Sequence, residues 1–168
     1  NGGKRISGSI DISGAKNAVL PLMTAALLVD GETTINSVPD LRDTRTMIRL
    51  LKIIGAEVAF NNSSLAINAS GVNNLEAPYD LVKTMRASFY VLGPLLARFG
   101  EVRVSLPGGC AWGPRPVDYH LKGLEKLGAT ISLESGYIMA KAKYLKGNKI
   151  SFDFPKLRLA PKLSSPCF

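Results

Sequence analysis

The stretch IRLLKIIGAEV at residues 48–58 has a counterpart in LKGLEKLGATI at residues 121–131, and this pair decides the fold. In each copy, apolar residues at helical spacing are followed by Gly-Ala and then by strand-forming residues. A glycine directly after the last helical turn favours a left-handed cap, which we expect at Gly55 and Gly128. Each copy is therefore predicted to be an amphipathic helix that ends at its glycine and leads into a strand.

The similarity extends to both sides of this pair. Upstream of each copy lie a long apolar helix, a Gly-Glu step and an alternating strand, and downstream lies a second short strand. These elements are expected at residues 18–29, 33–37 and 64–68 in the first copy and at 81–98, 102–106 and 137–142 in the second. Residues 5–12 and 149–152 are expected as strands that open successive units. The repeating unit is therefore βαβαββ, with two nearly complete copies and the beginning of a third.

This repeat predicts a mixed α/β (α+β) fold with three segments. Residues 1–14 form an opening strand segment, and residues 15–154 form a lobe of two units and the start of a third. Residues 155–168 contain three basic residues and three prolines, no acidic residue and no helical or strand period, so we expect a tail that does not pack as a third unit.

Composition narrows the class of protein. The 168 residues are 46% hydrophobic and 20% charged, which is typical of one packed globular domain. The net charge of +8 favours anionic ligands. Because the basic residues are scattered and no nucleic-acid-binding motif occurs, small anionic ligands fit better than nucleic acid.

Disulfide-rich, secreted, membrane-spanning and metal-binding proteins are excluded by the counts of cysteines, apolar residues and histidines. Two cysteines are too few for a disulfide framework, which favours a reducing, cytoplasmic compartment. No signal peptide opens the chain, and the longest apolar stretch, residues 18–29, is too short to span a bilayer. With one histidine and no acidic cluster at ligand spacing, we expect no metal site and no cofactor.

A loop with an unusual cysteine interrupts the second copy. PGGCAWGPRP at residues 107–116 holds three glycines and three prolines, which exclude a helix or a central strand. A free cysteine is most often a buried apolar residue. Here Cys110 has little apolar cover, the glycines allow close approach of a ligand, and Arg115 favours the thiolate. The first copy has only residues 38–40 at this place, so the loop is typical of a site added to a scaffold.

Three further groups of residues could bind anions. In SGAKN at residues 13–17, Asn17 and Lys16 form either a helix cap with a surface lysine or an anion site at a helix start. Asp80 is a plausible cap of the second long helix, with Lys83, Arg86 and Tyr90 on one face that could simply be solvated. Pro116 suits a first helical position, which places Arg115 at a helix entrance. There it could bind a phosphate or pair with Asp118.

Together these segments resemble one enzyme family. SGAKN at 13–17, DLVKTMRAS at 80–88, LGPLLAR at 92–98 and the Gly-Gly-Cys loop with Arg-Pro-Val-Asp at 115–118 are similar to the UDP-N-acetylglucosamine enolpyruvyl transferases. The resemblance runs from Arg5 to Phe154. It implies an inside-out α/β barrel in which each of two lobes contains three βαβαββ units, with residues 1–14 belonging to the inter-lobe region.

The resemblance also implies a reaction and its residues. The enolpyruvyl group of phosphoenolpyruvate would be transferred to the 3′-hydroxyl of UDP-N-acetylglucosamine, the first committed step of peptidoglycan synthesis. Cys110 would donate a proton to the phosphoenolpyruvate methylene and form a covalent adduct with it. Lys16 and Asn17 would contact phosphoenolpyruvate. The expected UDP-N-acetylglucosamine contacts are Arg86, Arg115, Pro116, Val117, Asp118 and Tyr119.

The chain departs from the family pattern after Phe154. Residues 156–168 replace the segment that would continue the third unit, as a frameshift would, and the second lobe with its general-base aspartate is absent. We therefore expect this chain to be inactive alone. Two alternatives remain: a relative that transfers enolpyruvyl to shikimate 3-phosphate, which would not need the Gly-Gly-Cys loop, and a non-catalytic lobe that binds UDP-sugar.

Overall fold

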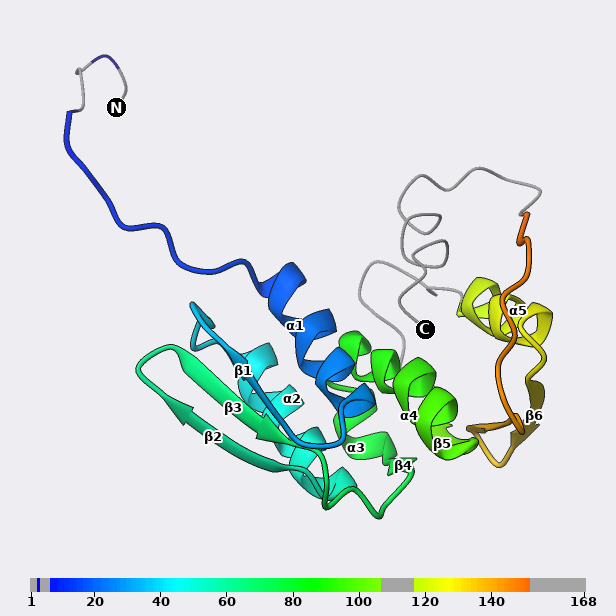
Figure 1. The fold of residues 1–168 in the computed structure, drawn as a ribbon. Coiled ribbons are helices and arrows are strands. Elements are labelled where there is room, and N and C mark those ends of the chain that lie inside the picture. Colours follow the sequence, from blue (N-terminus) through cyan, green and yellow to red (C-terminus); the bar gives the residue numbers. More distant parts are fainter. Residues whose placement is uncertain (1–2, 4–6, 107–116, 152–168) are drawn as a thin grey trace.

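The computed structural model describes residues 3, 7–106 and 117–151, which form two small sheets with helices packed between and against them (Figure 1). The first unit contains α1 (Lys16–Ala25), η1 (Ala26–Leu28), β1 (Glu32–Ile35), α2 (Arg42–Ile54), β2 (Glu57–Asn61) and β3 (Ser64–Asn68). The second contains β4 (Glu76–Ala77), α3 (Tyr79–Val82), η2 (Arg86–Val91), α4 (Leu92–Phe99), β5 (Glu101–Ser105), α5 (Asp118–Lys126), β6 (Thr130–Glu134) and β7 (Tyr137–Lys141).

The two sheets have the same antiparallel strand arrangement. The first has the order β1-β3-β2 with antiparallel pairing throughout, and the second has β4-β5-β7-β6 with the same antiparallel core. In each, the closing hairpin turns through two residues of positive φ, at residues 62–63 and 135–136. Such turns match the right-handed twist of the strands they join. The second sheet alone has an added parallel strand, β4 beside β5.

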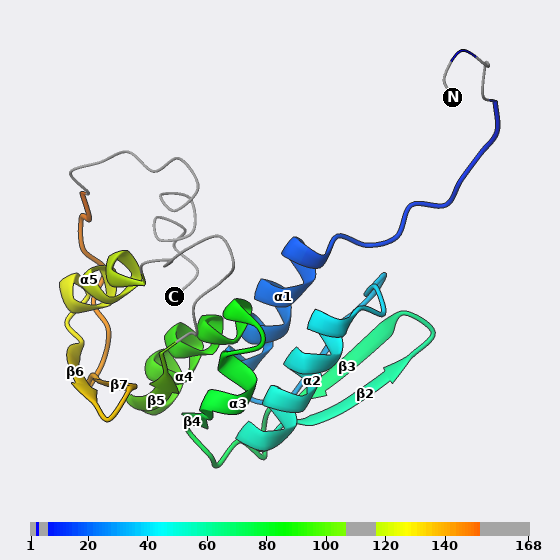
Figure 2. The ribbon, with the colours of Figure 1, turned by 180° about the vertical axis from the view of Figure 1, so that it is seen from behind.

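The core lies between the helices and the sheets, and Figure 2 shows α1 and α2 packed over one face of the first sheet, with α4 nearer the second unit. Its largest fully buried side chains include Met23, Leu50, Ile67, Leu95 and Ile138, which come from both units. Because the two units share this core, neither sheet buries its apolar face alone.

Arg98 of α4 connects the two units by hydrogen bonds. Its Nη1 donates to the carbonyl oxygens of Leu27, Val29 and Ala69 at 2.9, 3.1 and 3.1 Å. Its Nη2 lies 2.7 Å from the carboxylate of Asp30. These carbonyls mark the ends of η1 and β3, so a side chain of the second unit satisfies backbone acceptors of the first.

The predicted repeat is confirmed. Gly55 and Gly128 have φ of 105° and 102°, and each follows its helix as expected. The strand expected at residues 64–68 is β3. The strands expected at 33–37, 102–106 and 137–142 are β1, β5 and β7, with ends that differ by at most two residues, and the strands expected after the two Gly-Ala steps are β2 and β6.

The two opening strands were expected wrongly. Residues 7–12 and 149–151, the described parts of the two opening strands, form no strand. Ile10 and Ile12 are 87% and 93% exposed, because no described strand pairs with this segment. A strand without a neighbour has no partner for its backbone hydrogen bonds.

The second long helix is also not continuous. The helix expected at 81–98 is divided into α3, η2 and α4, and Met85 between them is extended, with φ −147° and ψ 107°. This break lets Met85 and Phe89 both reach the core, where they are 6% and 4% exposed. Gly93 and Pro94 lie in the first turn of α4, where a missing N–H costs no hydrogen bond.

No helix among the described residues is long and apolar enough to cross a membrane.

Candidate functional site

The start of α1 is fixed by a close backbone approach at Gly14. A Cβ placed on Gly14 would lie 1.7 Å from the carbonyl oxygen of Ser37, so only glycine fits against this turn. The helix begins two residues later, and Ala15 before it is extended without a side-chain cap. Of the two interpretations of Asn17, the helix cap is therefore wrong: Asn17 is the second residue of α1 and its side chain is exposed.

Lys16 is held by an acid from the next helix. Its Nζ lies 2.7 Å from a carboxylate oxygen of Asp43, in the first turn of α2. The two side chains are 44% and 32% exposed, so the pair lies at the surface with the lysine accessible to a ligand. The pair therefore places one ammonium group beside the starts of two packed helices, where free N–H groups also favour anions.

Arg86 is the first residue of η2 and is exposed. Because the chain is broken at Met85, Lys83, Arg86 and Tyr90 do not share the face of one helix as predicted. Lys83 instead makes an ion pair of 2.6 Å with Asp80, which lies in the first turn of α3 and is not its cap. The hydrogen bond from Lys83 to Asp80 raises the pKa of Lys83.

The first turn of α5 contributes three of the predicted residues. Val117 precedes α5 and is half-buried against the core, Asp118 is exposed, and Tyr119 is half-buried. The next residue, His120, packs edge-on against Phe89 of η2, with ring centroids 5.8 Å apart and planes at 80°. This contact brings the start of α5 next to η2, the element that begins with Arg86.

The remaining predicted residues, Cys110, Arg115 and Pro116, lie outside the described residues. The structure thus locates Lys16, Asn17, Arg86 and residues 117–119 on α1, η2 and α5. Among residues 3, 7–106 and 117–151, no group of three or more histidine, cysteine, aspartate and glutamate side chains could hold a metal ion.

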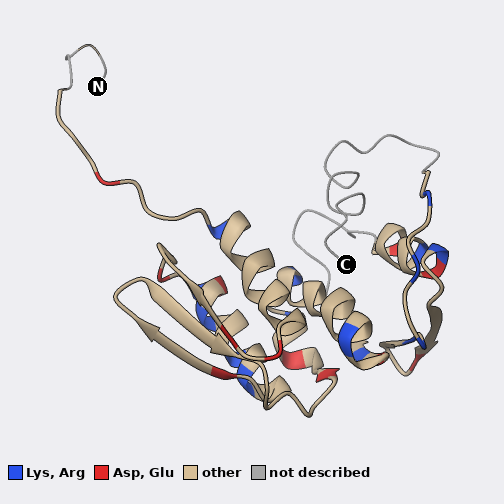
Figure 3. Cartoon of the chain, viewed as in Figure 1, with Lys and Arg blue, Asp and Glu red and all other residues tan. Residues whose placement is uncertain are grey.

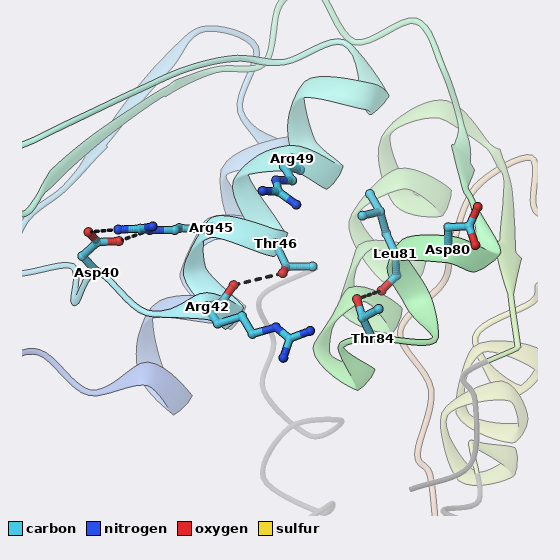
Figure 4. A pocket seen from close by; sticks show the side chains of 8 residues that line it. All are labelled: Asp40, Arg42, Arg45, Thr46, Arg49, Asp80, Leu81 and Thr84. Atoms are coloured by element: carbon cyan, nitrogen blue, oxygen red, sulfur yellow. Dashed lines mark hydrogen bonds and ion pairs between the residues drawn. The ribbon is translucent and has the colours of Figure 1, made fainter.

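The structure also reveals functional candidates that we did not predict. Asp43 is one of them, because it holds the ammonium group of Lys16. The sequence did not indicate it, because the pairing depends on how α1 and α2 pack. A second set lines a pocket of about 580 Å³ between α2 and the turn of α3 (Figure 4). Its lining is rich in arginine: Asp40, Arg42, Arg45, Thr46, Arg49, Asp80, Leu81 and Thr84. The helical spacing of its arginines in the sequence could have indicated this face.

One arginine of this pocket is already bound within it. The Nε and Nη2 atoms of Arg45 donate to the two carboxylate oxygens of Asp40, both at 2.6 Å. These hydrogen bonds lower the pKa of Asp40 and raise that of Arg45. The pair is a bidentate fork in which both charges are satisfied.

Comparison with known proteins gives a consistent picture. Residues 1–157 match the family described as EPSP synthase (3-phosphoshikimate 1-carboxyvinyltransferase). The chain is 58% identical over 154 residues to the UDP-N-acetylglucosamine 1-carboxyvinyltransferase of Desulforapulum autotrophicum, covering 92% of this chain and 37% of that protein. It is 56% identical to the protein of the same name from Chlorobaculum parvum, again over 92% and 37%. The chain therefore spans little more than a third of the length of these relatives.

Solved structures agree on the fold. The enolpyruvyl transferase NikO from Streptomyces tendae superposes with a TM-score of 0.72 at 26% identity, over 86% of this chain and 32% of that one. An EPSP synthase from Acinetobacter baumannii superposes with a TM-score of 0.63 at 18% identity, over 88% and 36%, which supports the fold alone.

Proposed function

This chain belongs to the EPSP synthase family of carboxyvinyltransferases, and we propose that its protein transfers the enolpyruvyl group of phosphoenolpyruvate to the 3′-hydroxyl of UDP-N-acetylglucosamine. One observation carries the choice of acceptor. Identity is 58% to a relative named for UDP-N-acetylglucosamine, against 18% to a solved EPSP synthase. The Gly-Gly-Cys loop supports the same choice.

The reaction needs a proton donor and anion contacts. The acceptor hydroxyl gives its proton to a base as its oxygen bonds to C2 of phosphoenolpyruvate, while a proton is added to the C3 methylene. Loss of that C3 proton and of phosphate from C2 then restores the double bond. Cys110 is the proposed donor, because a thiol can hold a proton near neutral pH and release it readily. Its thiolate can also bond to C2 while C3 gains a proton, which gives a covalent adduct with no group lost.

Lys16 is the proposed phosphoenolpyruvate contact that the described residues support best. Its ammonium is oriented by Asp43 at 2.7 Å and yet is 44% exposed, so it can bind a phosphate or carboxylate without losing its position. Asn17, also exposed, follows it on α1. A fixed cation of this kind lowers the cost of orienting a charged substrate.

The UDP-sugar is proposed to lie between η2 and the start of α5. Arg86 begins η2, and the packing of His120 on Phe89 brings the start of α5 beside that element. Arg115 and Pro116 complete this proposed surface together with Val117, Asp118 and Tyr119. An arginine on each side of the site would suit a diphosphate, which guanidinium groups bind in a bidentate manner.

We propose that residues 15–154 form a catalytic lobe that works with a second lobe of the same enzyme. A reaction in a cleft needs both walls to exclude water and hold the substrates. In this proposal the product is a precursor of peptidoglycan, used for cell shape and division, and the reaction occurs in the cytoplasm without a cofactor.

The test is a chimeric enzyme in which a relative supplies the remainder of this lobe and the second lobe. Residues 5–154 replace the matching segment of the Desulforapulum relative, and phosphate release is measured with phosphoenolpyruvate and either acceptor. We expect release with UDP-N-acetylglucosamine and none with shikimate 3-phosphate. Cys110→Ala should abolish it, while Cys110→Asp, which retains an acidic proton, should keep part of it. Release with shikimate 3-phosphate, or full activity of Cys110→Ala, would refute the proposal. Binding of UDP-N-acetylglucosamine without turnover would favour a binding lobe.

A further inference from the structure

Three arginines lie on one face of α2 in an arrangement that does not favour the helix. Arg42, Arg45 and Arg49 are spaced i, i+3 and i+7, which places them on the same side of the helix; Figure 3 colours the basic positions of the α2 ribbon blue. Like charges at such spacings destabilise a helix, and a cation in the first turn opposes the helix dipole. Residues that cost helix stability are expected where a binding function retains them.

Two of the three arginines keep their binding capacity. Arg45 is occupied by Asp40 through two hydrogen bonds. Arg42 and Arg49 make no ion pair and no side-chain hydrogen bond within the part of the chain that the structure describes. Both are exposed, so their guanidinium groups are open to a ligand.

The opposite wall adds no free negative charge to the pocket. Asp80 is neutralised by Lys83 at 2.6 Å. The hydroxyls of Thr46 and Thr84 donate to carbonyl oxygens of their own turns, at 2.9 and 2.8 Å. Figure 4 shows Arg42 and Arg49 extending from α2 along the space that faces Leu81 and Thr84. Among the described residues of its lining, the pocket therefore presents two unpaired cations, and both carboxylates, those of Asp40 and Asp80, are already paired.

We propose that this pocket, between α2 and the turn of α3, binds a small anion of the phosphate class that carries two or more negative charges. Two guanidinium groups from one helix can each donate a pair of hydrogen bonds to separate oxyanion groups. The volume of about 580 Å³ exceeds a single phosphate and suits an organic phosphate or a diphosphate. This site uses none of the residues assigned to the proposed reaction and does not depend on it.

The test is calorimetric titration of the 168-residue chain with inorganic pyrophosphate at an ionic strength of about 0.15 M, where the Debye length is about 8 Å. We expect saturable binding that weakens about tenfold or more in the R42Q/R49Q double variant, which removes both free guanidinium groups. The matched control is K122Q/K126Q, which removes the same charge from exposed positions of α5 that make no ion pair among the described residues. It should bind within about twofold of the parent, because distant surface charges are screened.

Asp40→Asn gives a second measurement in the opposite direction. It frees Arg45 from its carboxylate partner, so pyrophosphate should bind about threefold tighter or better. No saturable binding to the parent chain, equal weakening in both double variants, or unchanged or weaker binding in Asp40→Asn would each overturn the proposal.

Discussion

Replacing Arg98 by methionine should weaken the connection between the two units. The Arg98 side chain is only 17% exposed and its guanidinium donates to three carbonyl oxygens, while methionine keeps an apolar stem of similar length against the core. Hydrogen bonds from a charged donor contribute about 1.5–3 kcal/mol each, and carbonyls left without a partner add a desolvation cost. Because one nitrogen serves all three acceptors, and because Asp30 is 79% exposed and contributes little, we expect a loss of about 3 kcal/mol.

Urea unfolding followed by far-UV circular dichroism measures this loss through the shift of the midpoint at constant slope. The control is Arg49→Met, the same substitution at an exposed residue without an ion pair among the described residues, which should change stability by less than about 0.5 kcal/mol. If Arg98→Met is no more than about 1 kcal/mol less stable than this control, Arg98 does not hold the units together as argued.

Three further predictions concern the site and its surroundings. Gly14→Ala should destabilise the chain by about 1–3 kcal/mol, since its Cβ would lie 1.7 Å from the Ser37 oxygen. The control is Gly8→Ala, where nothing lies within 4 Å of the added Cβ, and equal unfolding curves for the two variants would contradict this view. Asp43→Asn in the chimera should raise KM for phosphoenolpyruvate about tenfold while Glu101→Gln leaves it unchanged; a stability loss with normal KM would mean that Asp43 only supports the fold. The pKa of Asp40 should lie below 3.8 by carboxyl NMR titration and return toward 3.8 in Arg45→Gln. Because the folded pKa is the lower one, the pair's contribution to stability is present above the unfolded pKa and is lost as the pH falls through the folded pKa. Identical titrations in both chains would disprove the pairing.

Features with a local cause could be predicted from the sequence. Gly55 and Gly128 end their helices with positive φ because only glycine adopts that conformation without strain, so the repeat could be found from their spacing. The hairpins were predictable for another local reason, since short alternating runs flank each turn. The start of α5 was also placed within two residues.

Features that depend on tertiary packing could not be predicted from the sequence. The break at Met85 follows from the burial of Met85 and Phe89, which overrides the helical pattern of residues 81–98. The pairing of Lys16 with Asp43 depends on the packing of α1 on α2, and no motif joins these two positions. Residues 7–12 have the alternation of a strand, but a strand also needs a neighbour. The arginine face of α2 was visible as a spacing, while the pairing that leaves Arg42 and Arg49 free was not.

The most direct test of the account is the mass of the peptide that contains Cys110 after the chimera has been incubated with phosphoenolpyruvate. We predict that this peptide gains the mass of one whole phosphoenolpyruvate molecule, because the thiol adds across the double bond and nothing leaves. Lys16→Ala should slow the gain, since the anion is then held less well. A Cys110 peptide that stays unmodified while the chimera releases phosphate with UDP-N-acetylglucosamine would contradict the role given to this thiol.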